Sequence, residues 1–364
     1  MMEAPQSLDR PSQFDHQQHT FPSYQDIITA RDTIYPYIKT IPMRLLHADI
    51  SQDQKVYLKT ENLQINNSYK IRGALNVISH LLNTDDKTLF RSGIVTASSG
   101  NFACQLAYSL NIRQVTTELT LVVPTFASQQ KINKIREIYD HVRIVKLEPN
   151  DWIEIILKNK FDPHSLKIVE GSLNLDTLPF YISTATNFHV IAGSATVGLE
   201  IIDEIDDLNN TCVIIPYGGG GLTIGVATAM KHANPNIKFF ACEVETGAPL
   251  KASLENSTPT YVCFEPSFVD GIGSVTVIPH MFEEVKTLIE DSLVVSLDEV
   301  ANSMKLLYDD YGMVTEGAGA SSVAAYLKYK STVLKDFTKV VCLITGGSIE
   351  PGIFQSLINK PCLA

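Results

Sequence analysis

Short apolar runs rich in β-branched residues recur along the chain and are typical of buried strands. They lie at residues 93–97, 119–123, 142–147, 213–216, 239–242 and 340–344. Runs that stay apolar at consecutive positions predict strands covered on both faces, as in a parallel sheet.

Between most of these runs, apolar residues recur at helical spacing, for example over residues 102–110, 129–139 and 222–231. Strands that alternate with helices of this length predict crossover units and a parallel sheet, and hence an α/β fold. The alternation is interrupted over residues 148–195, where an amphipathic segment precedes a stretch rich in Pro, Ser and Thr. We interpret this interruption as the crossing between two sheets.

Composition excludes several classes of protein. The 364 residues carry a net charge of −11, which disfavours a nucleic-acid partner because a phosphate backbone requires a basic face. No apolar run approaches the roughly 20 residues that span a bilayer, so no membrane partner is expected. Residues 1–25 are predicted to be a flexible N-terminal tail, since the first twenty are polar and lack the apolar core of a secretory signal.

The six cysteines are scattered, and without Cys-x-x-Cys or His-x-x-x-His spacing we expect reduced thiols, no zinc and a cytoplasmic location.

The segment around Lys70 is the first that indicates chemistry. Ser68 is expected to cap a helix that begins at Tyr69, because its hydroxyl can accept a free backbone N–H. Lys70 then lies in the first helical turn, where the helix's partial positive charge lowers the pKa of an amine. A less basic lysine is a better nucleophile at neutral pH. A solvated surface lysine remains the alternative, and this segment by itself favours it.

Two turns between a strand and a helix carry groups that suit anions. In Ser98-Ser99-Gly100-Asn101, hydroxyls and an amide accompany free backbone N–H groups. The alternative interpretation is a simple capped turn between a strand and a helix.

The second turn contains four consecutive glycines, which leave the backbone bare for a phosphate; a merely flexible turn is the alternative. It comprises Gly218, Gly219, Gly220, Gly221 and Leu222. The spacing is not the Gly-x-Gly-x-x-Gly of dinucleotide binding, which counts against a nicotinamide-dependent oxidoreductase.

Lys70 in the frame Ser-Tyr-Lys-Ile-Arg-Gly-Ala, the Ser-Ser-Gly-Asn turn and the tetraglycine loop occur in this order. Together they resemble the fold type II pyridoxal-phosphate enzymes, in the branch of the serine/threonine dehydratases (ammonia-lyases) and serine racemases. The resemblance covers about residues 39–352. It implies a fold like that of the tryptophan synthase β chain, in which two parallel-sheet α/β domains hold pyridoxal 5'-phosphate in the cleft between them.

The resemblance also implies a role for each matching residue. Lys70 would carry the cofactor as a Schiff base, Tyr69 would pack on its ring, and Glu316 would lie close to the ring. Asn101 would bond the phenolic oxygen and Thr345 the pyridine nitrogen, while the backbone amides of Gly218, Gly219, Gly220, Gly221 and Leu222 would hold the phosphate. The substrate would be bound by Ser98, Ser99, Gly100, Asn101, Gly271 and Ser274.

These roles imply α,β-elimination of water and ammonia from L-threonine or L-serine, a small amino-acid substrate, with Lys70 as general base. The hydroxyl of Thr345 leaves the cofactor ring less electron-withdrawing than a carboxylate would, which favours elimination over transamination. Ser99 keeps serine racemase open as an alternative, because racemase-type enzymes use a serine here as an acid/base catalyst. A catalytically idle cofactor-binding relative and a β-replacement enzyme are further alternatives, and the intact Ser-Ser-Gly-Asn turn counts against the idle relative.

The resemblance divides the chain into a large domain of residues 26–89 and 169–364 and a small mobile domain of residues 90–168. It implies a homodimer. No metal is predicted, because Pro249 occupies an expected acidic position of the family's cation site, although Glu243 and the backbone of Gly247 remain. Ser194 and Ser348 also depart from the family pattern, at places where it has glutamine and asparagine.

Overall fold

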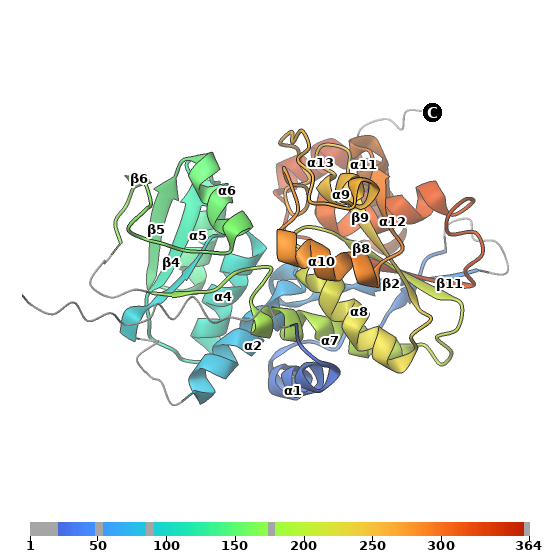
Figure 1. Ribbon diagram of the computed structural model, residues 1–364, viewed down its shortest axis with the longest axis horizontal. Coiled ribbons are helices and arrows are strands. Elements are labelled where there is room, and N and C mark those ends of the chain that lie inside the picture. Colours follow the sequence, from blue (N-terminus) through green and yellow to red (C-terminus); the bar gives the residue numbers. More distant parts are fainter. Residues whose placement is uncertain (1–20, 48–53, 85–90, 174–178, 360–364) are drawn as a thin grey trace, which may run out of the picture.

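The computed structural model describes residues 21–47, 54–84, 91–173 and 179–359. The described strands form two separate sheets, which lie side by side in Figure 1. The larger sheet has the strand order β1-β2-β11-β8-β9-β10, and its described strands run parallel except β1. Its strands are β1 (Arg44–Leu45), β2 (Lys55–Thr60), β8 (Thr211–Pro216), β9 (Lys238–Val244), β10 (Asp291–Val295) and β11 (Lys339–Ile344).

The smaller sheet has the order β6-β5-β4-β3-β7, and β6 is its antiparallel edge. Its strands are β3 (Ile94–Thr96), β4 (Leu119–Pro124), β5 (Val142–Leu147), β6 (Ile168–Glu170) and β7 (Phe180–Tyr181). All six strands predicted from apolar runs are therefore confirmed, as are the α/β class and the two sheets.

Helices cover both faces of the larger sheet, since successive side chains of each central strand enter different cores. Cys212 and Ile214 of β8 pack with α11, α12 and α13, whereas Val213 and Ile215 pack with α7, α8 and α10. This two-sided burial explains why the strands are apolar at consecutive positions. The helices are α1 (Tyr24–Ile34), α2 (Lys70–Asn83), α4 (Asn101–Ile112), α5 (Gln129–Ile138), α6 (Pro149–Lys158), α7 (Phe188–Glu204), α8 (Gly221–Ala233), α9 (Pro249–Asn256), α10 (Pro279–Leu288), α11 (Leu297–Tyr311), α12 (Gly317–Tyr329) and α13 (Pro351–Ile358).

Helix α2 joins the two halves of the molecule. Its residues Ala74, Val77 and Ile78 are buried with α4 and the smaller sheet, while its N-terminal turn lies beside the larger sheet, since Tyr69 N donates to Thr345 O after β11 (3.2 Å). The chain crosses back after β7, where α7 leads to β8, inside the interval predicted for the crossing.

The predicted domain boundaries remain a prediction, but several elements bear on them. The smaller sheet includes β7, beyond the predicted end of the small domain at residue 168. Residues 1–20 of the predicted tail lie outside the described ranges, and α1 begins at Tyr24, inside that tail, with Ser23 as its cap. None of the helices in the described ranges combines the length and apolar character needed to cross a bilayer.

Candidate active site

A cavity lies beside the loop that follows β8, and its wall also includes Thr184 and Ala185, which follow β7 of the smaller sheet. Strand ends of parallel sheets are common ligand sites because loops there present backbone and side-chain groups together. Its wall brings together many of the residues predicted to bind the cofactor or substrate: Tyr69, Lys70, Gly218, Gly219, Gly220, Gly221, Leu222, Gly271, Glu316 and Thr345.

Lys70 is the first residue of α2, so the predicted helix start at Tyr69 is wrong by one residue. Tyr69 is the N-cap and makes no side-chain capping bond, while Ser68 Oγ accepts only a long bond from Lys70 N (3.4 Å). The segment before the helix is held against the segment after β11, because Gly347 N donates to Asn67 O (2.9 Å). The pairing extends to Tyr69, whose N–H donates to Thr345 O (3.2 Å), so Lys70 directly follows the residue that contacts Thr345.

The pKa of Lys70 is lowered, as predicted, and burial of the amine is a principal cause. Burial penalises the charged amine, while the nearby carboxylates of Glu316 and Asp270 act in the opposite direction. The side chain is half-buried and lines the cavity, so a poorly hydrated amine is presented to whatever occupies it.

Glu316 and Asn101 meet across the two halves of the molecule. Asn101 Nδ2, at the start of α4, donates to both carboxylate oxygens of Glu316, at 3.0 and 2.9 Å. Burial raises the pKa of Glu316 to about 7, and the bond from Asn101 partly offsets this. Glycine at position 346 leaves room for the Glu316 carboxylate, because a Cβ there would lie 2.4 Å from Glu316 Oε1. The bond from Asn101 to the cofactor's phenolic oxygen stays a prediction, since this amide is engaged with Glu316.

The glycine loop approaches its neighbours so closely that side chains would not fit. A Cβ at Gly219 would lie 2.4 Å from Ala185 Cβ, and one at Gly221 would lie 2.4 Å from Ala185 O. Gly220 adopts φ 89°, a left-handed conformation that favours glycine, and serves as the N-cap of α8 without a side chain to cap it. The first N–H groups of α8 are therefore left at the cavity, which suits a phosphate.

Tyr217 supports this loop from outside the cavity. The phenol is buried, and its hydroxyl would lie 3.2 Å from a Cβ at Gly220. Burial raises the pKa of Tyr217 well above its usual range, so the hydroxyl remains neutral.

The turn of Ser98, Ser99 and Gly100 joins β3 to α4, and Asn101 at its end bonds the cavity residue Glu316 without lining the cavity itself. These three residues do not form part of the cavity wall in the described structure. The backbone of Ser274 lies elsewhere, within 3.2 Å of the position of a Cβ at Gly247. Their predicted contacts with substrate therefore stay predictions.

Several cavity residues were not predicted from the sequence. Ile272 directly follows Gly271, which the resemblance assigned to the substrate, and Thr223 follows the glycine loop directly. Ser194 had been noted only as a departure from the family pattern. The unpredicted wall residues are Ser68, Thr184, Ala185, Val190, Ile191, Ser194, Pro216, Thr223, Ile272 and Ala318.

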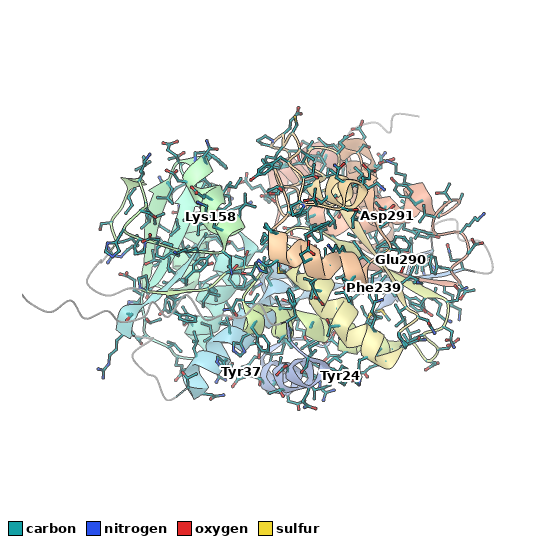
Figure 2. The ribbon with its side chains drawn as sticks, viewed as in Figure 1. Tyr24, Tyr37, Lys158, Phe239, Glu290 and Asp291 are labelled. Atoms are coloured by element: carbon teal, nitrogen blue, oxygen red, sulfur yellow. The ribbon has the colours of Figure 1, made fainter. Side chains whose placement is uncertain are left out.

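Glu243 already has protein partners for its carboxylate. Its oxygens accept the N–H groups of Leu250 and Lys251 (both 2.8 Å) and the hydroxyl of Ser292 (2.7 Å). Lys251 in turn pairs with Asp291 (2.9 Å), on the side of the larger sheet in Figure 2. No group of three or more His, Cys, Asp or Glu side chains suited to a metal occurs in the described ranges.

The residues of the cavity fit pyridoxal 5'-phosphate. Its aldehyde would be held by the poorly hydrated amine of Lys70, and its phosphate would meet N–H donors that have no capping side chain. The buried hydroxyl of Thr223, which has no hydrogen-bond partner in the described structure, adds a further donor on the same wall.

Comparisons with known proteins agree with this fit. Residues 35–346 match the family model "Pyridoxal-phosphate dependent enzyme". The chain is 34% identical over 308 residues to an L-threonine ammonia-lyase of Thermotoga maritima, covering 84% of this chain and 70% of that protein. It is 32% identical over 333 residues to the L-threonine dehydratase catabolic TdcB of Staphylococcus aureus, covering 90% and 89%.

A similar solved structure is the serine racemase of Dictyostelium discoideum, with a TM-score of 0.75 and 29% identity, covering 90% of this chain and 99% of that one. The resemblance expected from the motifs is thus confirmed. The chain belongs to the pyridoxal-phosphate dependent enzymes of fold type II, with pyridoxal 5'-phosphate as its cofactor.

Proposed function

We propose that this enzyme catalyses α,β-elimination from L-threonine, L-serine or both, releasing ammonia and 2-oxobutyrate or pyruvate. The observation that carries the proposal is the meeting of Lys70, Glu316, Thr345 and the glycine loop at one cavity. The identity to relatives named for threonine ammonia-lyase and dehydratase activity supports it. The water lost on elimination is regained when the nitrogen is released as ammonia, so the net reaction is a deamination.

Lys70 has two tasks in this proposal. The cofactor, when bound, supplies an electron sink for the charge left at Cα. Lys70 Nζ would hold the cofactor, and its free amine would take the proton from Cα of the substrate. The lowered pKa of Lys70 supports this role, since a larger fraction of the amine is then unprotonated and able to act as a base.

Glu316 and Thr345 would adjust the chemistry beside the lysine. Near neutral pH the Glu316 carboxyl is partly protonated, because its pKa is about 7, and Asn101 holds it in place. Thr345 offers a neutral hydroxyl to the pyridine nitrogen, which favours loss of the β-hydroxyl over transamination. Ser98, Ser99 and Gly100 would bind the substrate carboxylate, with Gly271 and Ser274 near the substrate.

Serine racemisation is the second candidate. It is supported by the likeness to the Dictyostelium serine racemase and by Ser99, a hydroxyl residue in the turn that the resemblance assigns to substrate. This reaction would need Ser99 to return a proton to Cα on the face opposite to Lys70.

The proposal is tested by incubating the purified protein and its Lys70→Ala variant with L-threonine and L-serine separately. We expect a visible absorbance band of lysine-bound cofactor and keto acid formation, both lost in the variant, with a rate decrease of at least about 100-fold. Lys238→Ala is the matched control, because Lys238 pairs with Glu290 at the surface. D-serine formed faster than pyruvate would instead favour the racemase, and a band without product would indicate an idle binder or another substrate.

We also propose that the enzyme is a homodimer in the cytoplasm. The dimer rests on the family resemblance. The location is supported by Cys104, Cys212, Cys242 and Cys342, which are buried and unpaired thiols. Light scattering of the purified protein tests the assembly, and the mass of a single chain would contradict it.

A further inference from the structure

Thr223 carries a buried hydroxyl whose partner is missing from the described protein. It is the third residue of α8, and its side chain is 1% exposed. Its Oγ1 makes no hydrogen bond within the described ranges. Leaving such a group unsatisfied is destabilising, so a buried hydroxyl on a cavity wall suggests a ligand that accepts its proton.

Other helical threonines of this chain satisfy their hydroxyls locally. Thr228, in the same helix, donates to Ile224 O at 2.8 Å, and Thr33 donates to Thr29 O at 2.8 Å. These are bonds to the carbonyl four residues back, the usual partner of a helical threonine. For Thr223 that carbonyl belongs to Gly219, which precedes the left-handed Gly220 and so lies outside the helix. The local partner is therefore lost.

The place of Thr223 identifies the acceptor. It lines the cavity together with Gly218, Gly219 and Gly220, where the first turn of α8 has no side-chain cap. N–H groups and one hydroxyl, all donors, are thus gathered at the positive end of a 13-residue helix. An anion with several acceptor oxygens fits such a set, and the phosphate of the cofactor is that anion.

We propose that the Thr223 hydroxyl is a side-chain ligand of the cofactor phosphate, in addition to the backbone amides of the glycine loop. The proposal rests on the cofactor of the family and is independent of which amino acid is the substrate. Thr223 would therefore contribute to the binding of pyridoxal 5'-phosphate only through a contact with the phosphate.

Cofactor affinity, measured without any amino acid present, tests this assignment. The full-length protein is freed of cofactor and titrated with pyridoxal 5'-phosphate and, separately, with pyridoxal, which lacks the phosphate. We expect Thr223→Val to weaken binding of pyridoxal 5'-phosphate by about tenfold or more and to leave pyridoxal unchanged. Thr223→Ser should bind like the wild type. Thr228→Val is the matched control and should change neither affinity.

Equal affinity of wild type and Thr223→Val for pyridoxal 5'-phosphate would overturn the proposal. An equal loss for both ligands would also overturn it, because the effect would then come from packing. If the valine variant does not fold, Thr223→Ala gives the same comparison. A second readout is thermal unfolding: the cofactor-free valine variant should be at least as stable as the wild type, while the rise in Tm on adding cofactor should shrink.

Discussion

The buried carboxyl of Glu316 makes the folding stability of the protein depend on pH. The side chain is 6% exposed and faces Lys70 and Asp270 as well as Asn101. Burial raises its pKa from the usual 4.5 to about 7, so the folded protein binds this proton more tightly than the unfolded chain. The stabilisation from that proton is complete below about pH 4.5 and is lost as the pH rises through 7.

We therefore expect the cofactor-free protein to lose up to about 3 kcal/mol of unfolding free energy from this group between pH 4.5 and 7.5. Glu316→Gln removes the titration, so its stability should fall less over the same interval. Urea denaturation at a series of pH values measures the difference. Glu283→Gln, at an exposed acid paired with Lys286, is the control, and parallel curves for wild type and Glu316→Gln would contradict the prediction.

The hydroxyl of Ser99 is expected to be required for racemisation but not for elimination. Elimination requires no proton return to the second face of Cα, whereas racemisation does. In Ser99→Ala we expect keto acid formation from L-threonine to change by less than about tenfold. Any D-serine formation should fall by at least about 100-fold, the usual contribution of a general acid. Chiral chromatography of the products checks both. Loss of both activities together would contradict this prediction, because it would show that elimination also depends on the Ser99 hydroxyl.

At the scale of elements, the start of α2 is held by a network of buried charges. Arg72, two residues after Lys70, makes two bonds to Glu61 (both 2.8 Å) and two to Glu200 of α7 (2.7 and 2.9 Å). Lys59 of β2 also bonds Glu200, at 2.6 Å. All four side chains are buried and their charges balance, which offsets the cost of removing them from water. The network fixes α2, and therefore Lys70, against α7 and the larger sheet.

The same contact between α2 and α7 depends on Gly193. A Cβ there would lie 2.4 Å from Arg72 O and 2.8 Å from Asn76 Cβ, and backbone of a packed helix cannot easily move away. We expect Gly193→Ala to cost about 1–3 kcal/mol of unfolding free energy. It should also weaken the visible cofactor band.

Gly352→Ala provides the matched control for this element. It lies in α13, where a Cβ would meet no atom within 4 Å. Urea denaturation of both variants gives the comparison. An equal effect of the two substitutions would show that the crossing of α2 and α7 has more room than the contact distances indicate.

At the scale of the whole molecule, the two halves are joined over the cavity by polar contacts. Lys131 of α5 pairs with Asp270 at 2.5 Å, beside the cavity residue Gly271, and Asn101 bonds Glu316 nearby. The side chains of Lys131 and Asp270 are 35% and 56% exposed, so solvent and salt weaken the attraction.

A double-mutant cycle of Lys131→Met and Asp270→Asn measures this link. We expect a coupling of about 0.2–1 kcal/mol in unfolding free energy at low salt, and less at 1 M salt. A parallel cycle on Glu154 and Lys158, a pair confined to α6, is the control for an ion pair that does not join the two halves. Figure 2 shows Lys158 on the side of the smaller sheet. No coupling at either salt concentration would mean that the two halves are held together by other contacts.

The sequence by itself determined the features that depend on neighbouring residues. The strands could be read as apolar runs because a strand buried on both faces needs apolar side chains at consecutive positions. The glycine loop could be predicted as a functional turn because glycine is required there: Gly220 adopts a left-handed conformation, and Gly219 and Gly221 lie too close to Ala185 for a side chain. Lys70 was identified by its motif, and the resemblance then indicated the family and its cofactor.

The tertiary structure alone decided the contacts between residues far apart in the chain. Asn101 and Glu316 are 215 positions apart and Lys131 and Asp270 are 139 apart, so their pairing depends on how the two sheets face each other. The burial that lowers the pKa of Lys70 could not be predicted either, because it depends on residues from several distant segments around the cavity. For the same reason, only the folded chain shows that Thr223 lacks the partner that Thr228 has. Local patterns specify elements, whereas desolvation and unsatisfied hydrogen bonds are properties of the assembled site.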